Sequence, residues 1–128
     1  MIYVDTSIVL AHLLAENRRP QDALWQQALV ASRLLEYELW TRLNARGLGR
    51  RHGEPARALL ARVDLVELTP QVLARALEPF PIAVRTLDAL HLASIEYLRG
   101  QRAVVELASY DERLLAGARA LNVPHYPC

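Results

Sequence analysis

The sequence contains no lysine and only one cysteine, and both shortages narrow the chemistry available to the chain. Its 15 strongly basic residues are all arginine, so it has no lysine for a phosphate-binding P-loop or for Schiff-base chemistry. With Cys128 alone, it can build neither a disulfide framework nor a cysteine zinc cluster. We therefore expect a reducing compartment, the cytoplasm.

Long hydrophobic runs are also missing. No stretch of 18 apolar residues occurs, so the sequence predicts no membrane-spanning helix. The first residues carry no basic segment and are interrupted by Asp5, so we expect no secretory signal peptide. A formal net charge of +1 argues against strong nonspecific binding of nucleic acid by the chain as a whole.

The hydrophobic content is 52% over 128 residues, which is enough for one domain spanning residues 1–128. Short β-like runs are expected over residues 1–4, 30–32, 65–68, 103–108 and 123–126. Helical patterns lie between them, over about residues 6–15, 21–29, 33–46, 54–63, 70–78, 86–98 and 111–121. This alternation predicts an α/β fold, a three-layer α/β/α sandwich whose mostly parallel sheet has about four to five short strands.

Acidic residues follow two of the predicted strands. Ligands of open parallel sheets bind beyond the carboxyl ends of the strands, so Asp5 and Asp111 are expected at that edge. Each residue also begins a predicted helix, and an N-cap role is an equally good explanation for either one taken singly.

Asp88 is harder to explain as a structural residue. The helix predicted over residues 86–98 is apolar nearly all round, which is typical of a buried helix. A buried carboxylate needs a partner or a metal ion, because an unpaired buried charge is very costly. His91, one turn later, is a possible partner, although a packed histidine with a structural hydrogen bond is the more common case.

The helix predicted over residues 33–46 carries two glutamates, and its periodicity separates them. Glu38 falls inside the arc of leucines that faces the core, whereas Glu36 falls at its border. Glu38 is therefore predicted to point inward. A surface ion pair with Arg42, four residues later, is the structural explanation that remains open.

Four carboxylates at one sheet edge would raise each other's pKa values and would not stay ionised unaided. Hard divalent cations solve this problem, because Mg²⁺ prefers carboxylate and water oxygens. The sequence has no HExxH motif, cysteine nucleophile or glycine-rich phosphate loop that would indicate another chemistry. A cluster of acidic residues without any of these groups indicates metal-assisted hydrolysis of phosphodiester bonds.

Four segments, taken in this order, resemble the PIN-domain ribonucleases, and in particular the VapC-type toxins of bacterial toxin–antitoxin operons. They are MIYVDTS at residues 1–7, SRLLEYEL at 32–39, TLDALHLA at 86–93 and SYD at 109–111. The third is the most specific, and the resemblance covers essentially the whole chain.

The resemblance implies a PIN-like sandwich in which Asp5, Glu38, Asp88 and Asp111 bind Mg²⁺ or Mn²⁺ and carry out catalysis. It also implies supporting roles for Thr6 and for the hydroxyl of Ser109. Leu114 stands where some members of the family have a further acidic residue. Toxins of this type typically cleave single-stranded or looped RNA, form homodimers and are held inactive by a cognate antitoxin.

An arginine-rich segment and two tryptophans are the remaining candidates. RNA phosphates are possible ligands of Arg42, Arg46, Arg50 and Arg51 together with His52, although a solvated helix end explains the same cluster. Trp25 and Trp40 are expected to be packing or interface residues. The competing hypothesis for the whole chain is a non-catalytic α/β regulatory or binding module whose acidic residues act as caps and ion pairs.

Overall fold

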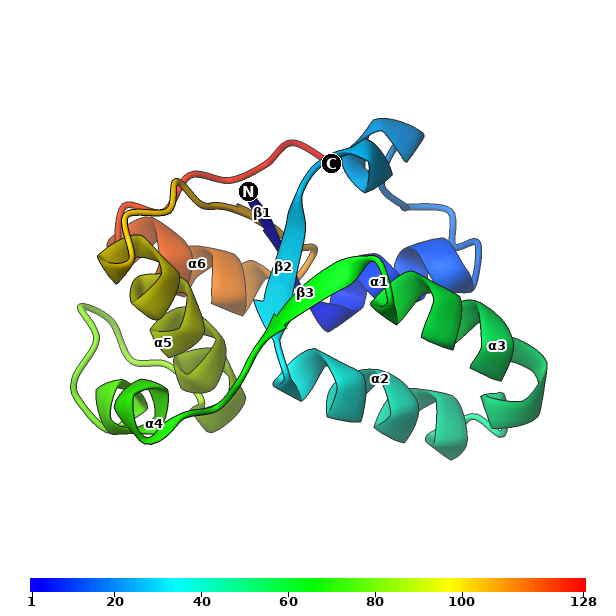
Figure 1. Cartoon of the computed structure of the whole chain (residues 1–128), viewed down its shortest axis with the longest axis horizontal. Helices are drawn as coiled ribbons and strands as arrows, with labels where there is room; N and C mark the ends of the chain where they lie inside the picture. Colours follow the sequence, from blue (N-terminus) through cyan, green and yellow to red (C-terminus); the bar gives the residue numbers. More distant parts are fainter.

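The computed structural model describes all 128 residues and shows an α/β fold built on a parallel sheet of four strands (Figure 1). The strands are β1 (Ile2–Val4), β2 (Leu29–Ser32), β3 (Val63–Val66) and β4 (Glu106–Ala108). Their order across the sheet is β3-β2-β1-β4, and every neighbouring pair is parallel. The predicted fold class is therefore confirmed.

Helices cover both faces of this sheet (Figure 1). One side carries α1 (Thr6–Leu13), α2 (Leu34–Ala45) and α3 (Gly49–Leu60). The other side carries α5 (Thr86–Gly100) and α6 (Glu112–Ala120), with α4 (Pro70–Ala76) packed against α5. None of these helices is long and apolar enough to cross a membrane.

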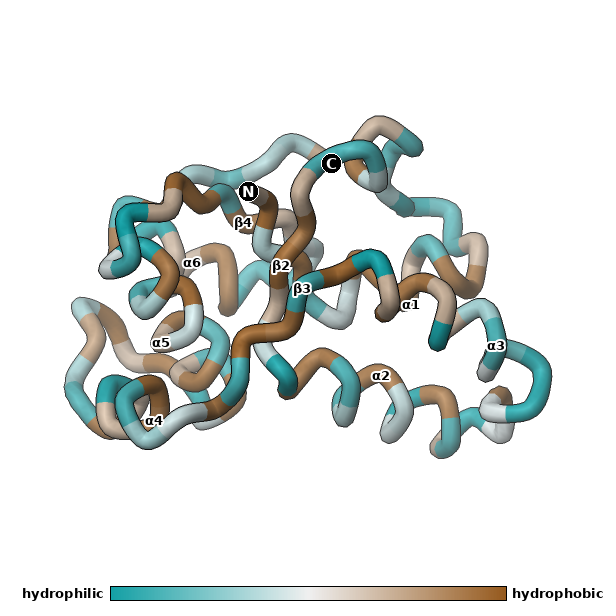
Figure 2. Tube along the Cα trace, viewed as in Figure 1, coloured by the Kyte–Doolittle hydropathy of each residue, from teal (hydrophilic) through white to brown (hydrophobic).

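Alternation along β1 divides the core into two halves. Ile2 and Val4 pack with α1, α2 and α3, whereas Tyr3, between them, packs with α5 and α6. Strands buried on both faces lack polar alternation: all four residues of β2 are buried, and Figure 2 shows β2 mostly in the hydrophobic colour, whereas the edge strand β3 exposes Asp64.

Two segments differ from the sequence-based prediction of helix. Residues 21–29 form only a short 3₁₀ helix, Asp22–Gln26, because the chain must become extended again where β2 begins. Its Leu24 and Trp25 are buried, so the packing role predicted for Trp25 is confirmed.

Helix α3 begins at Gly49 rather than near Pro55, which lies inside the helix. Gly47, with φ +67°, turns the chain directly from α2 into α3. The early turns of α3 pack against α2: a Cβ on Gly53 would lie 3.4 Å from the ring of Trp40. Tertiary packing thus sustains a helix across a proline that would end an isolated one.

The strand predicted over residues 123–126 is reduced to a single bridge between Leu107 and His125. Two prolines in this last segment, Pro124 and Pro127, lack the N–H that a strand needs. Only two backbone hydrogen bonds join it to β4, Leu107 N–H to Pro124 O and Tyr126 N–H to Leu107 O, both 2.8 Å.

Candidate functional site

The four predicted acidic residues line one pocket at the carboxyl edge of the sheet. Asp5 follows β1, Glu38 lies on α2, Asp88 lies in the first turn of α5, and Asp111 precedes α6. The strand order reverses here: the chain proceeds from β1 to β2 and β3 on one side, and β4 lies on the other. Loops and helix starts from four separate segments are therefore brought together.

The pocket is small, about 40 Å³, which is room for an ion or a few water molecules. A larger cavity of about 380 Å³ adjoins it and shares Glu38, Asp88 and Asp111. Arg42 lines both cavities, and Arg85 lines the larger one. The acidic pocket thus opens onto a space bordered by cations.

Asp5 is buried and its two oxygens have different partners. Oδ1 accepts hydrogen bonds from the Ser7 hydroxyl at 2.6 Å and from the Ile8 amide at 3.3 Å, so Asp5 does cap α1. Oδ2 accepts from the Ser109 hydroxyl at 2.6 Å. Burial raises the pKa of Asp5 above its usual range, although these hydrogen bonds oppose the shift. A nearby cation would favour the ionised form.

Glu38 points into the pocket as its helical position predicted. Its Oε1 accepts a hydrogen bond from Thr6 Oγ1 at 3.1 Å and lies 2.7 Å from His91 Nε2. Glu36 instead pairs with Arg33 at 2.9 Å on a more exposed face of α2. The supporting contact predicted for Thr6 is thus made to Glu38.

Asp88 and Asp111 share one cation, Arg85. The Nε of Arg85 lies 3.3 Å from Asp88 Oδ2, and its Nη2 lies 3.7 Å from Asp111 Oδ2. Asp111 also caps α6, because its Oδ1 accepts the amides of Arg113 at 3.0 Å and Leu114 at 3.3 Å. Asp5 and Asp111 therefore each do both things: they cap a helix and they line the acidic pocket.

As the side chains stand, no three acidic or histidine groups are placed to hold one ion in common. The contacts explain why: Arg85 bridges two of the carboxylates, while hydroxyls and His91 engage the other two. The charges are thus distributed among protein partners.

The arginine-rich segment divides into two parts. Arg42 lines the acidic pocket, but Arg46, Arg50 and Arg51 are exposed around the α2–α3 turn. Figure 1 shows this turn at the end of α2 that is remote from the sheet. His52 is half-buried there. Trp40 packs at the edge of the core, under the guanidinium of Arg57 at 5.0 Å.

Sequence reasoning missed Arg85 and the contact between His91 and Glu38. The three-residue spacing from Arg85 to Asp88, across a helix start, was an available signal for the first. His91 is a packed, hydrogen-bonded histidine, the more common case: it does not pair with Asp88 but contacts Glu38, which is 53 residues away in the sequence. Nothing in the local sequence around His91 indicates that contact.

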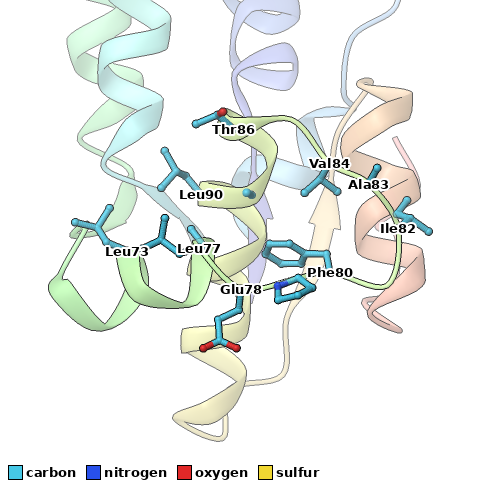
Figure 3. Close-up of a pocket in the computed structure, with 12 residues that line it drawn as sticks. Leu73, Leu77, Glu78, Phe80, Ile82, Ala83, Val84, Thr86 and Leu90 are labelled. Atoms are coloured by element: carbon cyan, nitrogen blue, oxygen red, sulfur yellow. The ribbon is translucent and has the colours of Figure 1, made fainter.

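A separate, largely apolar pocket lies between α4, the loop that follows it and the start of α5 (Figure 3). Its lining includes Leu73, Leu77, Phe80 and Ile82, and Figure 3 shows the carboxylate of Glu78 pointing away from the apolar side chains. It has a volume of about 620 Å³ and contains none of the four site carboxylates. The acidic pocket is therefore chemically distinct from the largest cavity.

Comparison with known proteins agrees with this arrangement. Residues 2–120 match the family model described as PIN domain. The chain is 34% identical to Ribonuclease VapC47 of Mycobacterium tuberculosis in an alignment that covers 95% of this chain and 93% of that protein. It is 32% identical to Ribonuclease VapC46 over 95% and 93% of the two chains. Ribonuclease VapC35 is 30% identical over 96% and 93%. The chain belongs to the PIN-domain family and is of the VapC type.

Proposed function

We propose that this chain is a divalent-metal-dependent endoribonuclease, the toxin of a toxin–antitoxin pair, active as one PIN-like domain over residues 1–128. The observation that carries the proposal is the convergence of four carboxylates from four segments on one pocket beside two arginines. The relatives named as ribonucleases support the same activity.

The donor set fits Mg²⁺ or Mn²⁺. Asp5, Glu38, Asp88 and Asp111 supply hard oxygen donors, which these ions prefer. A bound divalent ion lowers the pKa of its water and neutralises charge that develops on a phosphate during displacement. Burial raises the pKa of Asp5, and a bound cation would favour the ionised form of this carboxylate.

The protein side chains have separate tasks in this proposal. Ser7 and Ser109 orient the carboxylate of Asp5, and Thr6 and His91 orient that of Glu38. Arg42 and Arg85, at the larger cavity, bind RNA phosphates beside the cleaved bond. The arginines at the α2–α3 turn extend phosphate binding away from the site.

The decisive test is cleavage of a mixed single-stranded RNA with EDTA, with Mg²⁺ and with Mn²⁺. We expect cleavage only with a divalent ion, and its loss in Asp88→Asn. Glu112→Gln, an exposed acid one residue after Asp111, is the control and should keep full activity. Equal cleavage with EDTA and Mg²⁺, or none under any condition, would favour the non-catalytic binding module.

Homodimer formation, cytoplasmic location and pairing with a cognate antitoxin complete the proposal. They rest on the resemblance to VapC-type toxins. Expression of the chain should arrest bacterial growth, and coexpression of a small neighbouring reading frame should relieve the arrest. Light scattering of the purified chain measures the oligomeric state directly.

A further inference from the structure

A continuous chain of polar contacts runs from the centre of the sheet to the acidic pocket. The hydroxyl of Tyr3, on β1, accepts the backbone N–H of Ser32 at 3.1 Å and lies 2.7 Å from His91 Nδ1. The opposite ring nitrogen, His91 Nε2, lies 2.7 Å from Glu38 Oε1. Tyr3 is fully buried and His91 is 3% exposed, so water cannot replace these contacts freely.

One arrangement of protons satisfies each of these contacts with a neutral His91 ring. The phenol of Tyr3 is protonated at neutral pH and has a single proton to donate. The phenol oxygen accepts the N–H of Ser32, and the phenol proton is then donated to His91 Nδ1. A neutral imidazole that accepts at Nδ1 carries its own proton on Nε2, where it faces the carboxylate.

The two oxygens of Glu38 are consequently unequal. Oε1 is held by two donors, Thr6 Oγ1 and His91 Nε2, whereas Oε2 has no partner in the protein. Only two buried side-chain atoms lack a hydrogen-bond partner, Trp25 Nε1 and the Tyr110 hydroxyl. Because Oε2 is not one of them and has no partner, it must be accessible to solvent. Glu38 therefore presents one fixed and one free oxygen at the pocket.

We infer that Tyr3 and His91 are positioning residues for Glu38: Tyr3 sets the tautomer of His91, and His91 orients the carboxylate so that Oε2 faces the pocket. The inference about metal binding rests on the proposed function. Loss of a hydrogen-bonded partner of a metal-binding side chain typically lowers metal affinity about 10–100-fold. We expect a loss of about that size when Tyr3 or His91 is replaced. We call the contacts from Tyr3 through His91 to Glu38 the relay. Through it, Tyr3, a residue of the sheet core, becomes part of the site.

Tyr3→Phe tests the relay because it removes only the hydroxyl and keeps the ring. Mn²⁺ affinity, measured by calorimetric titration, should fall about 10–100-fold while the circular dichroism spectrum is kept. In ¹⁵N NMR, the His91 proton of the wild-type protein should sit on Nε2, and this preference should weaken in the variant. Tyr97→Phe, the same change on the helix that carries His91, should alter neither quantity.

A double-mutant cycle separates positioning from a general loss of stability. His91→Gln keeps an N–H donor for Glu38 but needs no tyrosine to set a tautomer, so it should bind Mn²⁺ more tightly than His91→Ala. In the His91→Gln background, Tyr3→Phe should no longer reduce Mn²⁺ affinity. An equal reduction in both backgrounds would overturn the relay.

The ring tautomer also separates failure of the relay from failure of the proposed function. A wild-type protein that binds no Mn²⁺ contradicts the proposed function, while the NMR comparison still decides the relay. A His91 proton on Nδ1 in the wild type, or an unchanged Nε2 proton in Tyr3→Phe, would overturn it.

Discussion

The hydroxyl of Ser109 donates a hydrogen bond of 2.6 Å to Asp5 Oδ2, although 104 residues separate the two in the sequence. The contact exists because β1 and β4 are parallel neighbours, with Val4 opposite Ala108, so both residues follow their strands at the same edge. The carboxylate is nevertheless buried, and burial raises its pKa more than the hydroxyls lower it. Ionised Asp5 is thus a source of instability in the metal-free protein.

The first prediction concerns the pH dependence of stability. Because the folded-state pKa of Asp5 is raised, the folded protein binds this proton more readily than the unfolded chain does. The resulting stabilisation is fully present below the unfolded pKa, about 4, and is lost as pH rises through the folded value. An asparagine at this position does not titrate, so the Asp5→Asn variant does not lose this stabilisation. Its free energy of unfolding relative to wild type should therefore increase as pH rises from about 4 through the folded pKa of Asp5.

Urea unfolding in EDTA at a series of pH values measures this difference. Asp64→Asn, an exposed residue of β3, is the control and should show no such trend. A difference between Asp5→Asn and wild type that stays constant with pH would contradict the raised pKa.

The second prediction concerns the metal ion. A ligand at 100 times its Kd stabilises the folded state by about 2.7 kcal/mol, so Mg²⁺ or Mn²⁺ should raise the Tm of the wild-type protein. Asp5→Asn loses one of the proposed oxygen donors, and its metal-induced shift should shrink or vanish. Differential scanning fluorimetry with and without metal provides the comparison. Equal shifts in the two proteins would show that Asp5 does not bind the ion.

The sequence could predict the parts of this structure that depend on periodicity. The inward position of Glu38 follows from the leucine arc of α2, and the common edge of Asp5 and Asp111 follows from parallel strands. The prediction failed where distant packing decides local structure. Helix α3 passes through Pro55 because it packs on α2, and no local pattern encodes the contact of His91 with Glu38.

The third prediction separates the two glutamates of α2. Glu38→Gln keeps the shape of the side chain but removes its charge, so the rate of RNA cleavage should fall about 100-fold or more. That loss corresponds to an increase of about 2.7 kcal/mol in the activation free energy. Glu36→Gln loses only an ion pair with Arg33, and its rate should stay within about threefold of wild type. Single-turnover cleavage with matched folding controls measures both. Exchange of these two behaviours would make Glu36 the site residue.

The fourth prediction separates RNA binding from chemistry at the α2–α3 turn. Arg50 and Arg51 are exposed and remote from the pocket, so replacing both by alanine should leave the metal-induced Tm shift intact. If both contact phosphates, the slope of log K against log salt should decrease by about 1.4 in magnitude for single-stranded RNA. Fluorescence anisotropy at several salt concentrations, with Ca²⁺ in place of Mg²⁺, tests this. An unchanged slope would assign the cluster to a solvated helix end.

The last prediction concerns Arg85, which bridges Asp88 and Asp111 at the pocket. A guanidinium beside these carboxylates opposes a divalent ion in two ways: it repels the ion and it occupies oxygen atoms that would bind it. Removing its charge should therefore tighten Mn²⁺ binding. The same side chain lines the larger cavity, where a released guanidinium can contact an RNA phosphate. Removing it should weaken RNA binding at saturating metal.

Arg85→Gln is thus expected to move the two affinities in opposite directions, which a general loss of folding cannot do. Calorimetric titration with Mn²⁺ should give a lower Kd than wild type, and anisotropy with RNA should give a higher one. Arg119→Gln, which removes an exposed arginine from the last turn of α6, controls for the change in net charge and should leave Mn²⁺ binding near the wild-type value. Weaker binding of both ligands would mean instead that Arg85 organises the pocket, by holding Asp88 and Asp111 in place.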